Sequence, residues 1–72
     1  MKEAKDAEGK MVKVGDWVEF KCDIEQIGKV VAISRAWSGR VDFTLEADGG
    51  FAGEYIGGQT RANIEADRCY LI

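Results

Sequence analysis

The sequence predicts a small all-β protein of five to six short antiparallel strands, and three observations support this fold class. Apolar and polar residues alternate with a period of two in several segments that turn-forming residues separate. No segment repeats apolar residues at the spacing of an amphipathic helix. The chain has 72 residues, enough for one domain with a thin core. Short, closely spaced strands are typical of a small barrel or sandwich, and a barrel leaves no open sheet edge.

The first ten residues are expected to form a flexible charged tail, and residues 11–72 the folded domain. Residues 1–10 combine lysines with acidic residues and show no apolar periodicity. They lack the apolar stretch of a secretory signal peptide, and no apolar run in the chain approaches the roughly 18 residues of a membrane span. A cytoplasmic location is therefore expected.

Two strands are predicted in the first half of the domain. The first follows a Gly15-Asp16 turn and directs alternate side chains inward, namely Val14, Val18, Phe20 and Cys22. Residues 22–28 are predicted to form a polar connection. The second strand, residues 29–35, is apolar on both parities, which indicates a central strand or a strongly bent one.

The second half of the domain is predicted to hold the remaining strands. A hairpin turn over residues 36–39 leads into the clearest alternation of the chain, with Val41, Phe43, Leu45 and Ala47 inward. Asp48-Gly49-Gly50 predicts another turn. Residues 59–65 alternate again, residues 66–68 suit a short 3₁₀ turn, and residues 69–72 form a last strand.

Both ends of this pattern resemble SH3-like barrels of the KOW and Tudor-like type. Val12-Lys-Val-Gly-Asp-Trp-Val-Glu-Phe20 and Gly28-Lys-Val-Val-Ala-Ile33 are similar to the Gly-Asp turn and first two strands of those barrels. Glu65-Ala-Asp-Arg-Cys-Tyr-Leu71 resembles their closing 3₁₀ turn and last strand. The resemblance implies an SH3-like barrel but no single function, because this fold serves many.

Three shorter segments resemble small uncharacterised proteins of tailed bacteriophages. They are Phe20-Lys-Cys-Asp-Ile-Glu-Gln26, Gly50-Phe-Ala-Gly-Glu-Tyr55 and Ala66-Asp-Arg-Cys69. This similarity implies a phage or prophage origin, hence the cytoplasm of a host cell, and assigns no activity.

The side-chain inventory argues against an enzyme. The chain has no histidine, which removes the commonest general base and metal ligand. Cys22 and Cys69 lack the spacing of a zinc site and fall on inward parities. They are expected to be buried free thiols, with a disulfide between them as the alternative. We therefore predict no catalytic residue, no metal and no cofactor.

The hairpin tip is the first of two candidate binding surfaces. It places Trp37 between Arg35 and Arg40, an arrangement suited to base stacking and phosphate contacts. The alternative is that Trp37 folds back over the core. Nucleic acid is disfavoured because the chain has 10 basic and 13 acidic residues, a net charge of −3.

The glycine-rich segment over residues 49–58 is the second candidate surface. Its ligand-binding candidates are Phe51, Glu54 and Tyr55, together with Arg61. Trp17 is expected either to join these aromatic residues and Tyr70 in a protein-binding groove or to cap the core. The sequence thus predicts a non-catalytic binding module with a protein partner, and a KOW-like domain for RNA or single-stranded nucleic acid is the alternative.

Overall fold

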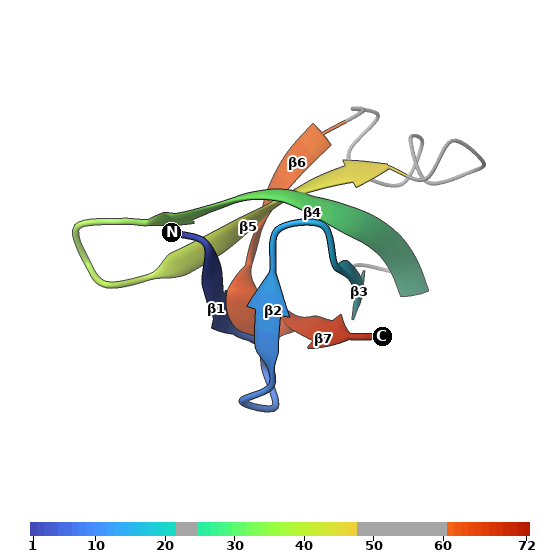
Figure 1. Cartoon of the computed structure of the whole chain (residues 1–72), viewed down its shortest axis with the longest axis horizontal. Helices are drawn as coiled ribbons and strands as arrows, with labels where there is room; N and C mark the ends of the chain where they lie inside the picture. Colours follow the sequence, from blue (N-terminus) through green and yellow to red (C-terminus); the bar gives the residue numbers. More distant parts are fainter. Residues whose placement is uncertain (22–24, 48–60) are drawn as a thin grey trace.

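The computed structural model describes residues 1–21, 25–47 and 61–72, which form strands and one 3₁₀ turn (Figure 1). No α-helix occurs in these ranges, and hence none with the length and apolarity of a membrane span. The all-β prediction is confirmed. The elements are β1 (Glu3–Lys5), β2 (Met11–Lys13), β3 (Trp17–Lys21), β4 (Glu25–Arg35), β5 (Val41–Ala47), β6 (Arg61–Glu65), η1 (Ala66–Arg68) and β7 (Cys69–Leu71).

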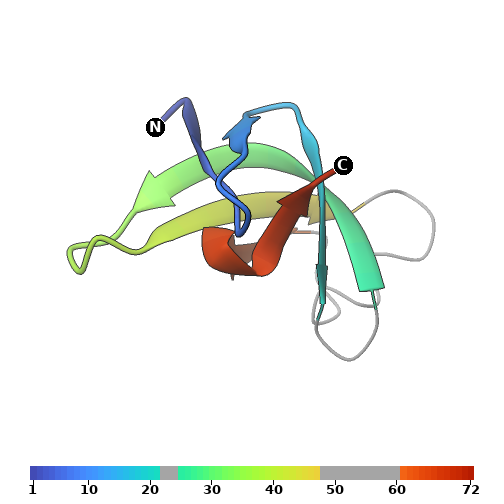
Figure 2. The same cartoon turned by 90° about the horizontal axis from the view of Figure 1, so that it is seen from below.

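The described strands form two antiparallel sheets. The larger has the order β6-β5-β4-β3-β7, and the smaller consists of β1 and β2. The larger sheet is open, with β6 and β7 at its two edges. Figures 1 and 2 both show the hairpin between β4 and β5 extending away from β3 and β7.

Strand β4 is the longest of the described strands and the centre of the larger sheet. Its register with β5 shifts between Val30 and Ala32, so the strand is central and also carries a bulge, as its doubly apolar sequence predicts. The strand begins at Glu25, where the sequence predicts a connection. That prediction is wrong for residues 25–28, because they pair with β3 from Lys21 back to Val18.

The core lies between the inner face of the larger sheet and the smaller sheet. The inward side chains predicted for β3 and β5 are confirmed at Val18, Phe20, Phe43 and Leu45, all of which are buried. The remaining buried apolar residues are Ala4, Val12, Val30, Ile33, Ala66 and Cys69. Val14 was also expected inward, but it is 49% exposed. A turn at Gly15, where φ is +101°, separates it from β3 and interrupts the alternation.

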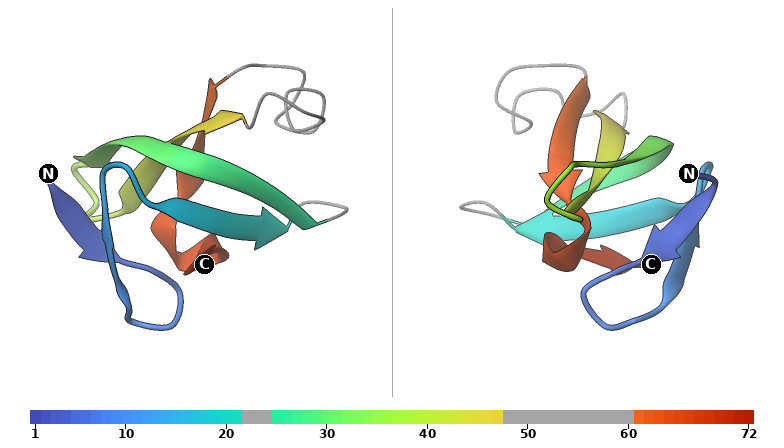
Figure 3. Two further views of the ribbon diagram at one scale, coloured as in Figure 1. Left: turned by 45° about the vertical axis from the view of Figure 1, so that its right-hand side comes forward. Right: turned by 90° about the vertical axis from the view of Figure 1, so that its left-hand side faces the viewer.

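The structure differs from the expected charged tail at residues 1–10. Strand β1 pairs with β2 (Figure 3), with Ala4 opposite Val12, and both of these side chains are buried. The alternation of β1 covers only three residues among charged neighbours, which is too short to stand out in the sequence. This segment is therefore part of the packed structure.

The carboxylate of Asp6 joins the smaller sheet to β7. Its Oδ1 accepts hydrogen bonds from the backbone N–H groups of Glu8 and Lys10, both at 2.9 Å. Its Oδ2 accepts one from the N–H of Leu71 at 2.7 Å, and the N–H of Ala7 donates to the carbonyl of Cys69 at 2.9 Å. The outer edge of β7 is thereby partly satisfied by the turn between β1 and β2.

Cys69 is a buried free thiol in the structure, as predicted. Its Sγ donates to the carbonyl of Glu65 at 3.4 Å. Burial raises the pKa of this thiol to about 12, and this effect outweighs the opposing charge of Arg68. Cys22 lies outside the described residues.

Candidate functional site

The outer face of strands β7, β3 and β4 carries a group of exposed apolar side chains. Val18 points into the core, so its neighbours Trp17 and Glu19 point outward. Glu19 is paired with Ile27 on one side and with Tyr70 on the other, and the N–H of Ile72 donates to the carbonyl of Trp17. The four exposed residues Trp17, Ile27, Tyr70 and Ile72, which we call the apolar face, therefore come together from three adjacent strands.

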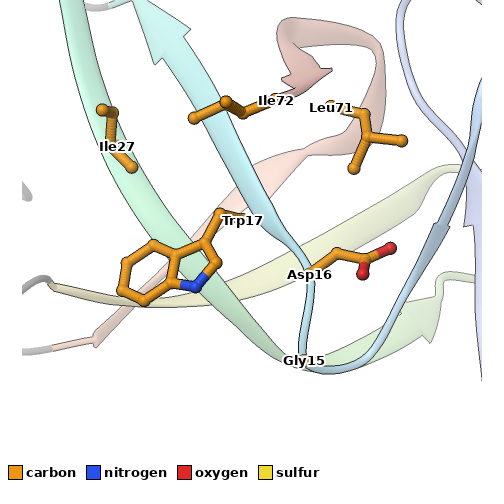
Figure 4. Close-up of a pocket in the computed structure, with 6 residues that line it drawn as sticks. All are labelled: Gly15, Asp16, Trp17, Ile27, Leu71 and Ile72. Carbon is orange, nitrogen blue, oxygen red and sulfur yellow. The ribbon is translucent and has the colours of Figure 1, made fainter.

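A groove of about 480 Å³ is hollowed at this face. In Figure 4 the indole of Trp17 lies beside Ile27, and Ile72 is on the same side of β3, whereas Leu71 and Asp16 extend to the other side. The residues that line the groove are Gly15, Asp16, Trp17, Ile27, Leu71 and Ile72. Its volume is within the range of small ligand sites.

Three charged residues lie around the groove and the apolar face. The carboxylate of Asp16 accepts a hydrogen bond from the N–H of Lys13 at 2.9 Å, which fixes it at the end of the groove. Glu19 lies between Ile27 and Tyr70, and Lys29 is opposite Trp17. Glu19 forms no ion pair with the described residues. The border thus carries two negative charges and one positive charge, which favours a partner with a basic group beside its apolar one.

The hairpin tip holds the most exposed aromatic residue of the described part of the chain. The hairpin is closed by hydrogen bonds from the N–H of Ala36 to the carbonyl of Arg40 at 2.8 Å, and from Gly39 to Ala36 at 2.9 Å. Gly39 has φ of +89°, a conformation that favours glycine, so the predicted turn is confirmed. Trp37 has a relative exposure of 107% and does not fold back over the core.

The two arginines of the tip differ in their ion pairs. Arg40 donates to Asp42 Oδ2 at 3.0 Å and lies 3.8 Å from a carboxylate oxygen of Glu65. Arg35 is exposed at the end of β4, and its side chain forms no hydrogen bond or ion pair with the described residues. Arg35 is therefore the one arginine of the tip whose charge no carboxylate of the described residues offsets.

The predicted site residues do not converge on one place. Arg61 forms an ion pair with Glu46, at 2.9 Å between Nη2 and Oε2, on the β5–β6 edge. Phe51, Glu54 and Tyr55 lie outside the described residues. Trp17 is in the groove, and Trp37 is at the tip. Trp17 is opposite Lys29, and Arg35, at the base of the tip, follows Lys29 by six residues on β4. At ~3.3 Å per residue, Trp17 and the base of the tip are therefore about 20 Å apart.

Searches against protein-family models, curated proteins and solved structures find no match to this chain. The chemistry of the site therefore rests on its geometry alone. Within residues 1–21, 25–47 and 61–72, no three acidic or cysteine side chains come together as a metal-binding group. The groove offers apolar surface with a charged border, an arrangement suited to recognition.

Sequence reasoning identified Trp17 and Tyr70 but missed Ile27 and Ile72. Ile27 falls in the segment predicted to be a connection, and Ile72 was assigned only to the last strand. The missed signal is the pairing of three strands at Glu19, because pairing determines which outward side chains become neighbours.

Proposed function

We propose that this chain is a small non-catalytic protein-binding module whose binding surface is the apolar face. The observation that carries the proposal is the clustering of Trp17, Ile27, Tyr70 and Ile72 on one face, where all but Tyr70 line a groove. Contiguous exposed apolar patches with polar borders mark interaction sites more often than scattered residues do. Exposed tryptophan and tyrosine are also the side chains that most often dominate binding energy.

The proposed partner is a protein segment that carries a bulky apolar side chain next to a lysine or arginine. The apolar side chain enters the groove, and the cation approaches Glu19 and Asp16. The net charge of −3 adds a favourable long-range term for such a segment.

An SH3-like barrel is the fold that best accounts for the larger sheet. The 3₁₀ turn η1 leads into β7, and β7 pairs with β3, the first strand of that sheet in sequence. This pairing of first and last strands supports the resemblance at residues 12–34 and 60–72. The bacteriophage origin and the cytoplasmic location stay predictions, and the genes that flank the coding sequence would test the origin.

Selection from a random-peptide display library tests the binding site. Peptides enriched on the wild-type protein are expected to pair an aromatic or aliphatic residue with lysine or arginine. Their affinity is expected to fall about tenfold or more, ~1.4 kcal/mol, in Ile27→Lys, which places a cation in the groove. Met11→Lys is the matched control, because Met11 is 44% exposed and Ile27 39%, both on strands. Enriched peptides that bind Ile27→Lys as well as the wild type would refute the site.

Single-stranded nucleic acid at the hairpin tip is the second candidate function. The full exposure of Trp37 favours it, since bases stack on exposed aromatic rings, and so does the Arg35 side chain, which has no partner among the described residues. The engagement of Arg40 by two carboxylates weakens it. A labelled oligonucleotide should bind with an affinity that falls steeply with salt and is lost in Arg35→Glu with Arg40→Glu. Binding unchanged in that double variant would exclude the tip.

A further inference from the structure

We infer that the groove of one copy of this chain accepts the Trp37 hairpin tip of a second copy. The inference rests on the proposed function, because it names an occupant for the same groove. It starts from two complementary features of one molecule. One is a closed hairpin that projects a fully exposed indole, and the other is a groove of about 480 Å³, large enough for such a ring.

The charges around the two features are also complementary. Arg35 ends β4 two residues before Trp37, and its side chain has no carboxylate partner in the described part of the chain. Asp16 lines the groove and Glu19 is paired with Ile27, so that together with Lys29, opposite Trp17, the border has a net charge of −1. Docking of the tip brings the unpaired cation to the acidic border as the indole enters, so one contact satisfies both the apolar and the charged requirement of the proposed partner.

The contact is between molecules. The tip is about 20 Å from Trp17 along the paired strands, at ~3.3 Å per residue, and the hairpin points away from β3 and β7 (Figures 1 and 2). A copy that docks its tip into a neighbour still has a vacant groove. Two copies that exchange tips form a two-fold dimer, whereas copies that dock head to tail extend into a chain or close into a ring.

The contact is small, because one side chain and its immediate neighbours fill it. Interfaces of this size are weak and transient, so a dissociation constant on the order of 0.1 mM is expected. Self-association should therefore appear in sedimentation velocity as the protein concentration rises through this range.

Complementation between two variants tests the inference. Trp37→Ala retains the groove without the tip residue, and Ile27→Lys retains the tip and blocks the groove. The self-association of each variant on its own is expected to be about tenfold or more weaker than that of the wild type, so each should be monomeric at concentrations where the wild type associates. Their mixture should form a 1:1 heterodimer that cannot extend. With ¹⁵N-labelled Trp37→Ala and unlabelled Ile27→Lys, amide shifts should be confined to the apolar face; with the labels exchanged, they should appear at residues 35–40.

Controls separate this contact from other associations. Met11→Lys in place of Ile27→Lys should leave self-association intact, and Ile72→Lys supplies a second groove variant should Ile27→Lys fold poorly. A wild-type protein that stays monomeric into the millimolar range, or a Trp37→Ala variant that associates like the wild type, would overturn the inference. In either case, the proposed function stands if the library peptides still require Ile27 for binding. If self-association fails and the peptides also bind independently of Ile27, the groove is rejected as a binding site.

Discussion

Replacing Asp6 by asparagine is the most direct test of how the smaller sheet is held to the larger one. The carboxylate of Asp6 accepts three backbone hydrogen bonds, at 2.7–2.9 Å, from Glu8, Lys10 and Leu71. An asparagine oxygen in place of Oδ1 keeps the bonds from Glu8 and Lys10. Its amide group then faces the N–H of Leu71, so a donor meets a donor at a buried position.

The size of the effect follows from that count of bonds. A hydrogen bond to a charged acceptor contributes about 1.5–3 kcal/mol, and Asp6→Asn loses one and weakens two. We expect the free energy of unfolding to fall by about 2 kcal/mol, and by about 3–4 kcal/mol in Asp6→Ala. A domain of this length has roughly 4–11 kcal/mol in total. The melting temperature should fall by about 8–16 °C in Asp6→Asn.

The pH dependence distinguishes this reasoning from a simple loss of packing. Burial alone raises the pKa of the Asp6 carboxyl, but the N–H groups of Leu71, Lys10 and Glu8 and the charge of Lys10 outweigh it, so the pKa is held below 3.8. The unfolded chain therefore binds a proton more readily than the folded one. The stabilisation is fully present above pH 3.8 and is lost as the pH falls through the lower pKa of the folded state.

Urea unfolding followed by circular dichroism at several pH values measures these effects. The wild type and Asp6→Asn should differ by about 2 M in midpoint at neutral pH, for an m value of ~1 kcal/mol/M, and should converge below pH 3.8. Asp67→Asn, at an exposed carboxylate of η1, is the matched control and should differ little from the wild type. A difference of less than about 0.5 kcal/mol, or one that persists unchanged in acid, would refute the role assigned to Asp6.

Three further predictions test packing at single positions. A Cβ on Gly28 would lie 3.0 Å from the Cβ of Leu45, so Gly28→Ala should lower the free energy of unfolding by about 1–3 kcal/mol, and an unchanged urea midpoint would contradict this close approach. Trp37→Ala should change it by less than about 0.5 kcal/mol, because the ring contacts almost nothing within the chain; a larger loss in thermal unfolding would mean that the tip is packed. In a Cys22→Ser variant, Cys69 should react with a disulfide reagent at pH 8 only at the rate of chain opening, because burial raises the pKa of its thiol to about 12. Reaction at the rate of a free thiol would place Cys69 at the surface.

Alternation predicted the strands wherever one face is core and the other is solvent. In β5, Phe43 and Leu45 are buried, and Asp42, Thr44 and Glu46 between and beside them are not. The same rule failed at β1, where a single buried alanine gives no pattern. It also failed at residues 25–28, where pairing with β3 forms a strand from residues that alone suggest a connection. The alternation of apolar and polar residues predicts a strand where one of its faces is buried, and it does not predict a strand that forms only because it pairs with a neighbour.

The candidate site depends on information of a different kind. The outward position of Trp17 follows from the parity of β3, and the exposed hairpin tip follows from the turn at Gly39. The neighbours of Trp17 follow only from the register of β3 with β4 and β7, and a slip of one residue in either pairing would send Ile27 or Tyr70 to the core side.

The Asp6 bond to Leu71 helps to set the position of β7 beside the smaller sheet. Asp6→Asn, which loosens β7, should therefore weaken peptide binding at the groove even at temperatures where the domain stays folded. Gly28→Ala acts through Leu45 on the inner face, so it should lower the stability of the domain more than its affinity for the peptide. Equal ratios of lost affinity to lost stability in the two variants would mean that the groove does not depend on the placement of β7.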